Sequence, residues 1–470
     1  MDTQKIFNLL CDNLKFSPNE KQINVIEKLS LFINDISFRG LFLLKGYAGT
    51  GKTSLIGSLV KSLLPIGKKM VLLAPTGRAA KVLSFHTKKK SLTIHKKIYW
   101  IKTNVKGNTY VTIKKNTHTN TIFIVDECSM IPDVSDQGFG GRSLLDDLIK
   151  YVYDGVNCKL ILIGDTAQLP PVKLDISPAL DENFLFLTYN KKVVSYELTE
   201  VMRQTSNSMI LNNATLLRNS IKNNDNQIPK LSCNNEVVRL NNGIDIQEAL
   251  EDAYSKSGVE GTIVICKSNK RANMYSQQIR SKIRWQEDDI SVGDYLMVVR
   301  NNYFWLPEDS KIGFIANGDT VEVLRIYEKN NFYNFRFARI LIRMVDYPNS
   351  PNLEVIVNLN ILTSDNPSMK YEEYKKLFES IEEDHMDISE KNIRFKKIKK
   401  SPYLNALQIK FAYAVTCHKS QGGQWENVFV EQGYFNSNTI DNDYLKWLYT
   451  AITRSTKKLY LINFKDQFFK

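Results

Sequence analysis

Apolar runs and polar turns alternate along the first part of the chain. Between Gly40 and Ile163, short stretches of consecutive apolar residues are each followed by a polar or glycine-containing turn and then by a helix-compatible segment. Such continuous apolar runs are typical of strands in a parallel sheet, because helices cover both faces of that sheet. We therefore predict an α/β lobe whose strands are residues 41–44, 70–74, 121–126 and 159–165.

A second apolar series begins at Glu197 and is interrupted. It contains the run 262–268 and a helical stretch from Arg271 to Arg284, and it resumes only with three more apolar runs, residues 409–416, 427–431 and 458–464. A strand pattern that continues across such a gap indicates a lobe with an insertion. We predict two α/β lobes, the first of residues 1–190 and the second of residues 191–285 and 406–470.

The interrupting segment, residues 286–405, has a different pattern. Up to residue 362, apolar and polar residues alternate between Asn and Gly turns, as in a small antiparallel barrel. Residues 364–400 then change from an acid-rich stretch to the basic run KNIRFKKIKK. We interpret this part as a solvated helical arm rather than a binding surface.

Composition narrows the class of partner. The chain of 470 residues carries a net charge of +13, which favours a polyanionic partner such as nucleic acid. Its six cysteines form no CxxC pair, so the sequence predicts neither a zinc site nor a disulfide framework. No apolar run approaches the roughly 20 residues of a membrane span, and the N-terminal residues do not resemble a signal peptide. We expect a cytoplasmic protein with reduced thiols and no membrane partner.

A glycine-rich loop follows the first predicted strand. The segment GYAGTGKT, residues 46–53, matches the pattern GxxxxGK[ST] and lies between a strand and a helix, which is the context that makes the motif meaningful. Backbone N–H groups of such a loop can bind phosphates, Lys52 can reach the terminal phosphates, and the Thr53 hydroxyl can ligate Mg²⁺. The predicted nucleotide-binding residues here are Gly46, Ala48, Gly49, Thr50, Gly51, Lys52, Thr53 and Ser54.

Residues that follow two further predicted strands can bind the metal ion, orient water and contact the γ-phosphate. Asp126 ends the strand TIFIV, where it can hold Mg²⁺, and Glu127 follows it, where it can polarise the water that attacks the γ-phosphate. A glutamate at this place favours hydrolysis over phosphate transfer to a metabolite. Gln168 follows the strand KLILIGD, and its amide can bond the γ-phosphate and detect its loss without titrating.

The ordered set of motifs resembles the superfamily-one helicases, and within them the class that includes the RecD and Dda helicases. The segments that carry the resemblance are FSPNEKQ (16–22), GYAGTGKT (46–53), LLAPTGRAAKVL (72–83), VDECSM (125–130), GDTAQLPPV (164–172), LTEVMRQ (198–204), VTCHKSQGGQWENV (415–428) and YTAITRSTKKLYL (449–461). The resemblance implies two RecA-like lobes with an SH3-like barrel inserted in the second, and ATP as the nucleotide. It also implies that Gln22 recognises the adenine, and that Arg203 and Arg454 reach the phosphates from the second lobe.

The same resemblance implies a track for a single strand. The residues expected to line it are Thr76, Arg78, Thr93, His95, Thr416, His418 and Ser420. Hydroxyls and backbone N–H groups suit this role because they hold phosphates without reading bases. After HKSQG the sequence reads Gly423, Gln424 and Trp425, where the family often has a small or polar residue, an acid and an aromatic. The nucleotide contact of that motif is therefore left open.

A strongly basic segment lies between two of these motifs. Residues 81–115 contain ten lysines and no acidic residue, and residues 97–121 read as a hairpin with a turn at 106–108. Lysines can follow a DNA backbone, while Tyr99 and Trp100 can stack on bases. A solvated basic hairpin with core aromatics is the alternative. In the helicase class, the corresponding hairpin acts as a pin that splits the duplex.

These observations lead to one expectation and two alternatives. We expect a helicase that uses ATP and Mg²⁺ to move along single-stranded DNA, 5′ to 3′ as its class implies, and that acts as a monomer at junctions of single and double strands. One alternative is a RecD-like subunit of a larger DNA repair or nuclease assembly. The other is a P-loop kinase or regulatory NTPase, against which Glu127, Gln168 and the two arginines argue.

Overall fold

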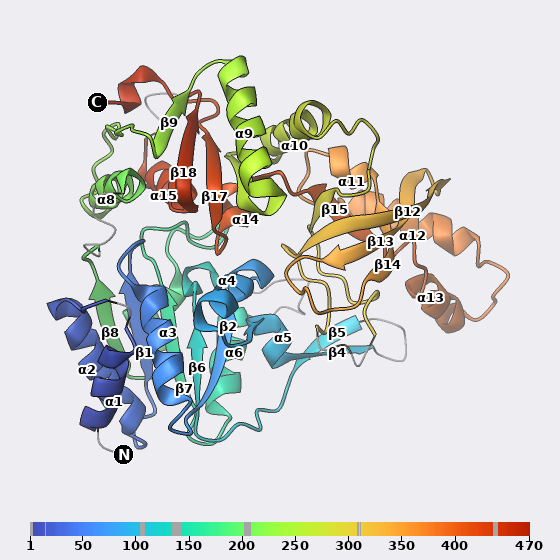
Figure 1. Cartoon of the computed structure of the whole chain (residues 1–470). Helices are drawn as coiled ribbons and strands as arrows, with labels where there is room; N and C mark the ends of the chain where they lie inside the picture. The colour runs from blue at the N-terminus through green and yellow to red at the C-terminus, as the bar shows by residue number, and fades with distance from the viewer. Residues whose placement is uncertain are drawn as a thin grey trace.

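Two α/β lobes stand one above the other in Figure 1, with a barrel at their side. The computed structural model describes residues 3–14, 16–103, 109–133, 143–201, 208–307, 310, 312–435 and 440–470. The first lobe contains a six-stranded parallel sheet with the order β3-β2-β6-β7-β1-β8. Its strands are β1 (Leu41–Gly46), β2 (Lys69–Ala74), β3 (Ser91–Thr93), β6 (Thr121–Val125), β7 (Lys159–Gly164) and β8 (Val193–Leu198).

Helices cover both faces of this sheet, as its continuous apolar strands require. Leu41 and Leu43 face a core that includes α5 (Ile94–Ile98), α6 (Leu144–Tyr153) and α7 (Glu182–Tyr189). Phe42 and Leu44 face the opposite core. That second core is formed by α1 (Thr3–Asp12), α2 (Glu20–Asn34), α3 (Lys52–Leu63) and α4 (Gly77–Thr87).

The second lobe contains a five-stranded parallel sheet with the order β16-β10-β17-β18-β9. Its strands are β9 (Val237–Leu240), β10 (Thr262–Cys266), β16 (Ala414–Thr416), β17 (Trp425–Glu431) and β18 (Ser455–Ile462). Its helices are α8 (Met209–Lys222), α9 (Gly243–Gly261), α10 (Asn269–Gln278), α14 (Cys417–Ser420) and α15 (Asn442–Ile452). The prediction of two lobes with parallel sheets is confirmed.

A closed five-stranded barrel is inserted in the second lobe, as predicted. Its strands are β11 (Tyr295–Val298), β12 (Thr320–Phe332), β13 (Phe335–Met344), β14 (Leu353–Asn358) and β15 (Leu407–Phe411). Four neighbouring pairs are antiparallel, but β14 and β15 run parallel, which corrects the prediction of a purely antiparallel barrel. Parallel strands need a long connection, and the arm supplies it. The arm consists of α11 (Asn360–Thr363), α12 (Tyr371–Glu383) and α13 (Lys391–Lys399).

Two predicted boundaries differ from the structure. Strand β8 pairs with β1, so the first sheet extends beyond residue 190 to Leu198. The apolar run 409–416, predicted as one strand of the second lobe, is divided between the last barrel strand β15 and the second-lobe strand β16. Only Ala412 and Tyr413 separate these two strands. Both strands are buried, so the hydrophobic pattern does not reveal the break.

Tyr413 fixes this short connection between the barrel and the second lobe. The side chain is completely buried, and its hydroxyl donates to Asp294 Oδ1 at 2.8 Å. The same aspartate accepts two hydrogen bonds of 2.9 Å from Arg280, which follows α10. The Tyr413 carbonyl accepts a hydrogen bond from the Val264 N–H of β10 at 3.1 Å. Barrel and second lobe therefore share a buried polar network as well as a continuous chain.

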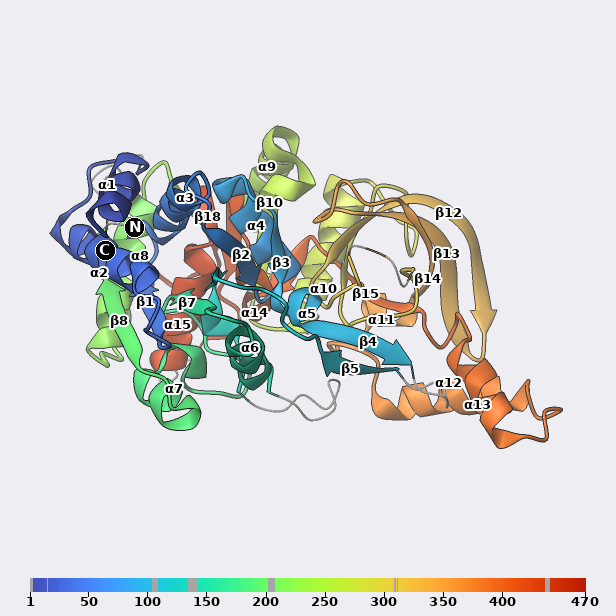
Figure 2. The same cartoon turned by 90° about the horizontal axis from the view of Figure 1, so that it is seen from below.

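The predicted hairpin is present. Strands β4 (Tyr99–Thr103) and β5 (Thr109–Ile113) pair in an antiparallel register that joins Tyr99 to Ile113. The predicted turn at 106–108 lies outside the described residues. Figure 2 shows the hairpin leaving the first lobe after α5 and running alongside the barrel. None of the helices in the described part of the chain is long and apolar enough to cross a membrane.

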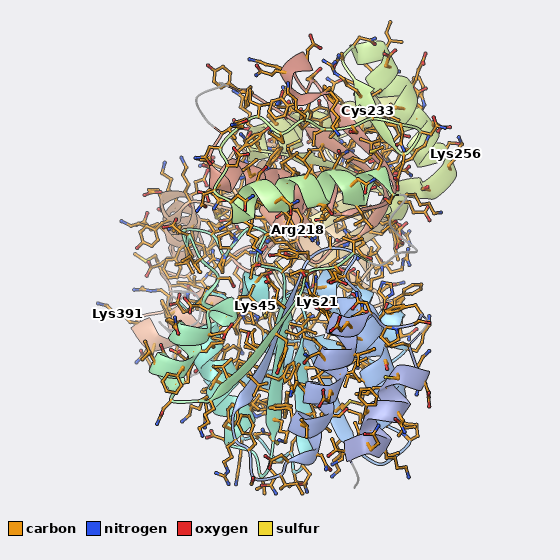
Figure 3. All side chains as sticks on the ribbon, turned by 90° about the vertical axis from the view of Figure 1, so that its left-hand side faces the viewer. Lys21, Lys45, Arg218, Cys233, Lys256 and Lys391 are labelled. Atoms are coloured by element: carbon orange, nitrogen blue, oxygen red, sulfur yellow. The ribbon has the colours of Figure 1, made fainter. Side chains whose placement is uncertain are left out.

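The two lobes meet along the edge where α8 crosses the boundary. Figure 3 shows Arg218, on α8, directly above the first lobe, with Lys21 and Lys45 below it. Its guanidinium donates to the Thr199 carbonyl at 2.9 Å and lies 4.7 Å from the centre of the Tyr47 ring. Tyr47, Ala167 and Leu169 of the first lobe also belong to the apolar core of the second. The lobes are thus in direct contact beside the glycine-rich loop.

Candidate active site

The glycine-rich loop connects β1 to the first turn of α3. Gly49 and Gly51 have φ values of 76° and 92°, a region that favours glycine. A Cβ atom on Gly49 would also lie 3.1 Å from Leu211 of the second lobe. The turn therefore presents the N–H groups at the start of α3, which is the arrangement that binds phosphate.

Lys52 lies across the mouth of this loop. Its ammonium donates to the carbonyls of Gly46 and Tyr47, the latter at 2.9 Å, and lies 3.9 Å from Asp165 Oδ2. The loop residue Ala48 also lines the cavity, and its N–H donates to the Tyr449 hydroxyl of the second lobe at 2.9 Å. That N–H is therefore directed to the other lobe. The role of Ala48 in binding nucleotide stays a prediction.

Neighbouring strands bring the acidic residues to the same edge. Since β6, β7 and β1 are adjacent in the sheet, the loops that follow them meet at its carboxyl end. Burial, and next the charge of Glu127, raise the pKa of Asp126 to about 7, while Lys52 opposes the rise. Glu127 has a φ of 54°, an unusual conformation for a residue with a side chain and one that occurs often at functional sites.

This acidic edge fits a divalent cation. Asp126 and Thr53 both line the cavity, so a carboxylate and a hydroxyl are available at the same edge. Hydroxyl and carboxylate oxygens are the ligands that Mg²⁺ prefers. Gln168 is buried beside them, and among the described residues its Oε1 atom has no hydrogen-bond partner. An acceptor left open inside a cavity is available to a ligand.

Arg454 is one of the second-lobe residues that line the cavity. Its Nη1 atom lies 3.8 Å from Glu127 Oε1, and its Nε atom donates to the Thr450 carbonyl at 3.0 Å. The cavity has a volume of about 620 Å³ and is lined by both lobes. Arg203, the other arginine predicted to reach it, lies outside the described residues. The structure thus brings Lys52, Asp126, Glu127, Gln168 and Arg454 around one cavity.

Gln22 lies beneath the loop rather than in the cavity. Its Nε2 atom donates to the Thr50 carbonyl at 3.0 Å, and its Oε1 atom accepts a hydrogen bond from the Asn19 N–H at 3.0 Å. The cavity is lined here by Asn13 and Phe16 instead. Recognition of adenine by Gln22 stays a prediction.

Three residues of the site were missed by the sequence reasoning. Asp165 follows β7 directly, so the argument from strand ends that found Asp126 could have found it. Tyr449 and Thr450 lie on α15, and the Thr450 hydroxyl accepts a hydrogen bond from the Leu169 N–H at 2.9 Å. Tyr449 and Thr450 lie five and four residues before Arg454 in the sequence. This nearness is only a weak signal of a role in the site, because it does not reveal their hydrogen-bond partners in the first lobe.

The residues predicted to line the path of single-stranded DNA are only partly accessible to solvent. Thr76 and Thr93 cap the first turns of α4 and α5, accepting hydrogen bonds from the N–H groups three residues later at 3.2 Å. Arg78 lies 4.4 Å from the centre of the buried Trp425 ring, across the boundary between the lobes. The remaining predicted positions are His95, partly exposed on α5, and Thr416 and His418, partly exposed at the start of α14.

Two track residues and one hairpin aromatic are buried, contrary to expectation. Thr93 is 2% exposed, and Ser420 is fully buried with its hydroxyl bonded to the Cys417 carbonyl at 2.7 Å. Tyr99 is a core residue whose hydroxyl donates to Asp147 at 2.8 Å. Trp100 is 56% exposed, with the Lys114 ammonium 4.5 Å from its ring centre. Of the two predicted stacking residues, only Trp100 presents a ring to solvent.

The barrel engages two lysines of the basic segment. The buried Lys96 ammonium lies 2.7 Å from the Tyr347 hydroxyl and 3.5 Å from Asp319 Oδ2. Lys81 donates to the Val345 carbonyl at 3.1 Å and lies 3.9 Å from Asp346. Burial raises the pKa of Asp319 to about 6, although Lys96 lowers it. These two lysines are thus bound to the barrel, which corrects the interpretation of the whole segment as a DNA-binding surface.

Two family models match separate parts of the chain. A family model described as "AAA domain" matches residues 19–237, and one described as "UvrD-like helicase C-terminal domain" matches residues 411–462. An uncharacterised protein of Acanthamoeba polyphaga mimivirus is 26% identical, with 94% of this chain and 99% of that protein covered.

Two curated relatives carry functional names. The RecBCD enzyme subunit RecD of Buchnera aphidicola subsp. Schizaphis graminum is 25% identical, with 100% of this chain and 77% of that protein covered. The ATP-dependent DNA helicase dda of Enterobacteria phage T4 is 25% identical, with 82% and 86% covered. A solved structure of Pif1 helicases at forked double-stranded DNA is 17% identical with a TM-score of 0.49, covering 97% of this chain and 94% of that chain.

The fold and the site define a P-loop NTPase with two RecA-like lobes and an inserted barrel. The matched models cover parts of both lobes, and the RecD and dda relatives align over most of the chain. The chain is therefore similar over both lobes to proteins that carry helicase names, the RecBCD enzyme subunit RecD and the DNA helicase dda.

Proposed function

We propose that this protein is an ATP-dependent DNA helicase that moves along a single strand and separates the duplex ahead of it. The observation that carries the proposal is the composite cavity: Arg454 of the second lobe lies 3.8 Å from Glu127 of the first. An arginine delivered across a cleft stabilises the transition state of phosphoryl transfer only when the lobes are together. The rate of ATP hydrolysis therefore depends on how the two lobes are placed relative to each other.

The first lobe holds the triphosphate in this proposal. Lys52 exchanges its carbonyl partners for phosphate oxygens, and the start of α3 supplies N–H groups. Thr53 and Asp126 would hold Mg²⁺, which neutralises phosphate charge when bound. Glu127 orients the attacking water, and the open Oε1 of Gln168 accepts a hydrogen bond at the γ-phosphate position.

DNA binding is assigned to the face that carries α4, α5, α14 and the hairpin. Thr76 and Arg78 lie where α4 meets the second lobe, because the Cβ position of Gly422 is 3.4 Å from Thr76 Oγ1 and the Arg78 guanidinium is 4.4 Å from the centre of the Trp425 ring. Thr416 and His418 lie a few residues before Gly422 in the chain. Trp100 and Lys114 offer a ring and a charge on the hairpin, which suits a junction between single and double strands. We propose that the enzyme acts as a monomer and moves 5′ to 3′.

ATP hydrolysis with and without single-stranded DNA tests the proposal. A helicase hydrolyses ATP faster when the strand is present, whereas a regulatory NTPase or a metabolite kinase is indifferent to it. Unwinding of duplexes with a 5′ tail or a 3′ tail then tests the direction, and preference for the 3′ tail would refute it. The matched RecD is a subunit of the RecBCD enzyme. Stimulated hydrolysis without unwinding by the purified chain would favour a subunit of this kind.

A further inference from the structure

One helix of the second lobe contacts all three loops of the phosphate site. Tyr449 and Thr450 of α15 bond to the loops after β1 and β7, and Arg454, just beyond the helix, approaches Glu127 after β6. The three side chains therefore move together with α15.

Tyr449 makes the most central of these contacts. Its hydroxyl accepts the hydrogen bond from the Ala48 N–H at 2.9 Å and donates to Asp165 Oδ2 at 2.8 Å. The side chain is 1% exposed, and its ring belongs to the apolar core of the second lobe. A single buried hydroxyl thus joins the glycine-rich loop, the strand end that carries Gln168, and the opposite lobe.

Asp165 connects this hydroxyl to the residue expected to bind phosphate. Its Oδ1 atom accepts a hydrogen bond from the Ala167 N–H at 3.0 Å, and its Oδ2 atom lies 3.9 Å from the Lys52 ammonium. Burial raises the pKa of Asp165, and Lys52 followed by the Tyr449 hydroxyl lower it. Because Lys52 and Tyr449 stabilise the same buried charge, a movement of the ammonium changes the strength of the Tyr449 hydrogen bond.

We propose that Tyr449 is a positioning residue that couples occupancy of the phosphate site to the placement of Arg454. When Lys52 turns towards phosphate, Asp165 relies more on the Tyr449 hydroxyl, and α15 is drawn to the first lobe with Arg454 on it. When phosphate leaves, Lys52 returns and the hydrogen bond weakens. This inference rests on the proposed function, because it describes how the second lobe responds to ATP.

Tyr449→Phe tests the inference, because it keeps the ring and removes only the hydroxyl. The groups that face phosphate remain, so KM for ATP stays within about twofold while kcat for DNA-stimulated hydrolysis falls roughly 10- to 100-fold, as expected for loss of a hydrogen bond to a charged group at the transition state. The number of base pairs opened per ATP also falls. Unchanged kcat, or a raised KM with kcat retained, would overturn the inference.

Tyr444→Phe is the matched control. Tyr444 lies on the same helix and is also buried, but its hydroxyl bonds to Gln432 within the second lobe at 3.3 Å. If Tyr449 served only the stability of α15, both variants would lose the same fraction of activity. Equal kinetic losses would therefore reject the coupling role.

Asp165→Asn provides a second route if Tyr449→Phe does not fold. It weakens the same hydrogen bond from the other side, so on its own it is expected to lower kcat for DNA-stimulated hydrolysis. Where both single variants fold, the double variant is expected to be no slower than the slower single variant. If the loss of kcat in the double variant equals the product of the two single losses, Tyr449 and Asp165 do not act through the same hydrogen bond. Lack of DNA stimulation in the parental enzyme would instead reject the proposed function, so the two failures are distinguishable.

Discussion

Replacing Lys96 by Met tests the contact between the first lobe and the barrel. The substitution keeps much of the apolar stem but removes the ammonium that lies 3.5 Å from Asp319. Asp319 is fully buried, so without Lys96 its carboxylate either bears an unpaired charge or takes up a proton. Protonation is the cheaper outcome near neutral pH.

The magnitude follows from the pKa of Asp319, which is about 6 with Lys96 present. Protonating a carboxylate above its pKa costs about 1.4 kcal/mol for each pH unit. The contact is therefore expected to lose roughly 1 kcal/mol at pH 7 and roughly 3 kcal/mol at pH 8 through Asp319. Loss of the hydrogen bond to Tyr347 adds about 1 kcal/mol at either pH.

Native-state hydrogen exchange measures this loss locally. Peptides that cover 316–347 are expected to lose protection in Lys96→Met, by roughly ten times more at pH 8 than at pH 7 after correction for intrinsic rates. Lys97→Met is the control, because Lys97 contacts His118 within the first lobe at 2.7 Å. A folded Lys96→Met protein whose barrel keeps parental protection at pH 8 would refute the reasoning, and so would an equal loss at both pH values.

Three further outcomes are expected. Lys52→Ala should abolish ATP hydrolysis while salt-sensitive binding of single-stranded DNA, measured by fluorescence anisotropy, persists; loss of both in a folded variant would contradict this division. Trp100→Ala should slow unwinding while DNA-stimulated hydrolysis continues. If the variant unwinds duplexes at the parental rate, the Trp100 ring takes no part in strand separation. Asp319→Asn should reduce the gain in stability at low pH: burial raises the pKa of Asp319 from 3.8 to about 6, so the folded state prefers the protonated form and gains stability as pH falls from 7 to 5. Calorimetric melting at both pH values checks this, and an equal gain in the variant would exclude Asp319 as the source.

The sequence predicted what depends on local pattern. Continuous apolar runs placed most strands of both parallel sheets, and the residues that follow them, from Lys52 to Asp126 and Gln168, surround one cavity. The order of these motifs resembles the helicase class that includes RecD and Dda, and relatives with these names align over most of the chain. Strand ends are informative because sheet topology brings them to a common edge.

Contacts between distant segments were not predictable in this way. Tyr99 looks like a stacking residue in sequence, yet a hydrogen bond to Asp147, on a helix more than forty residues away, holds it in the core. Lys81 and Lys96 belong to a basic run, but their acidic partners lie far along the chain: Lys81 pairs with Glu260 of the second lobe and with Asp346, and Lys96 pairs with Asp319 of the barrel. The divided run 409–416 is apolar and mostly buried, so hydrophobicity alone could not show that it serves two sheets.

The two-residue connection at Ala412 and Tyr413 has a mechanical consequence. Since Asp294, Arg280 and Tyr413 lock the barrel to the second sheet, the barrel is a rigid extension of the second lobe. Its contacts with α4 and α5, by contrast, are ion pairs and hydrogen bonds of lysines. A rotation of the second lobe relative to the first would therefore carry the barrel with it and would strain the lysine contacts that join the barrel to α4 and α5.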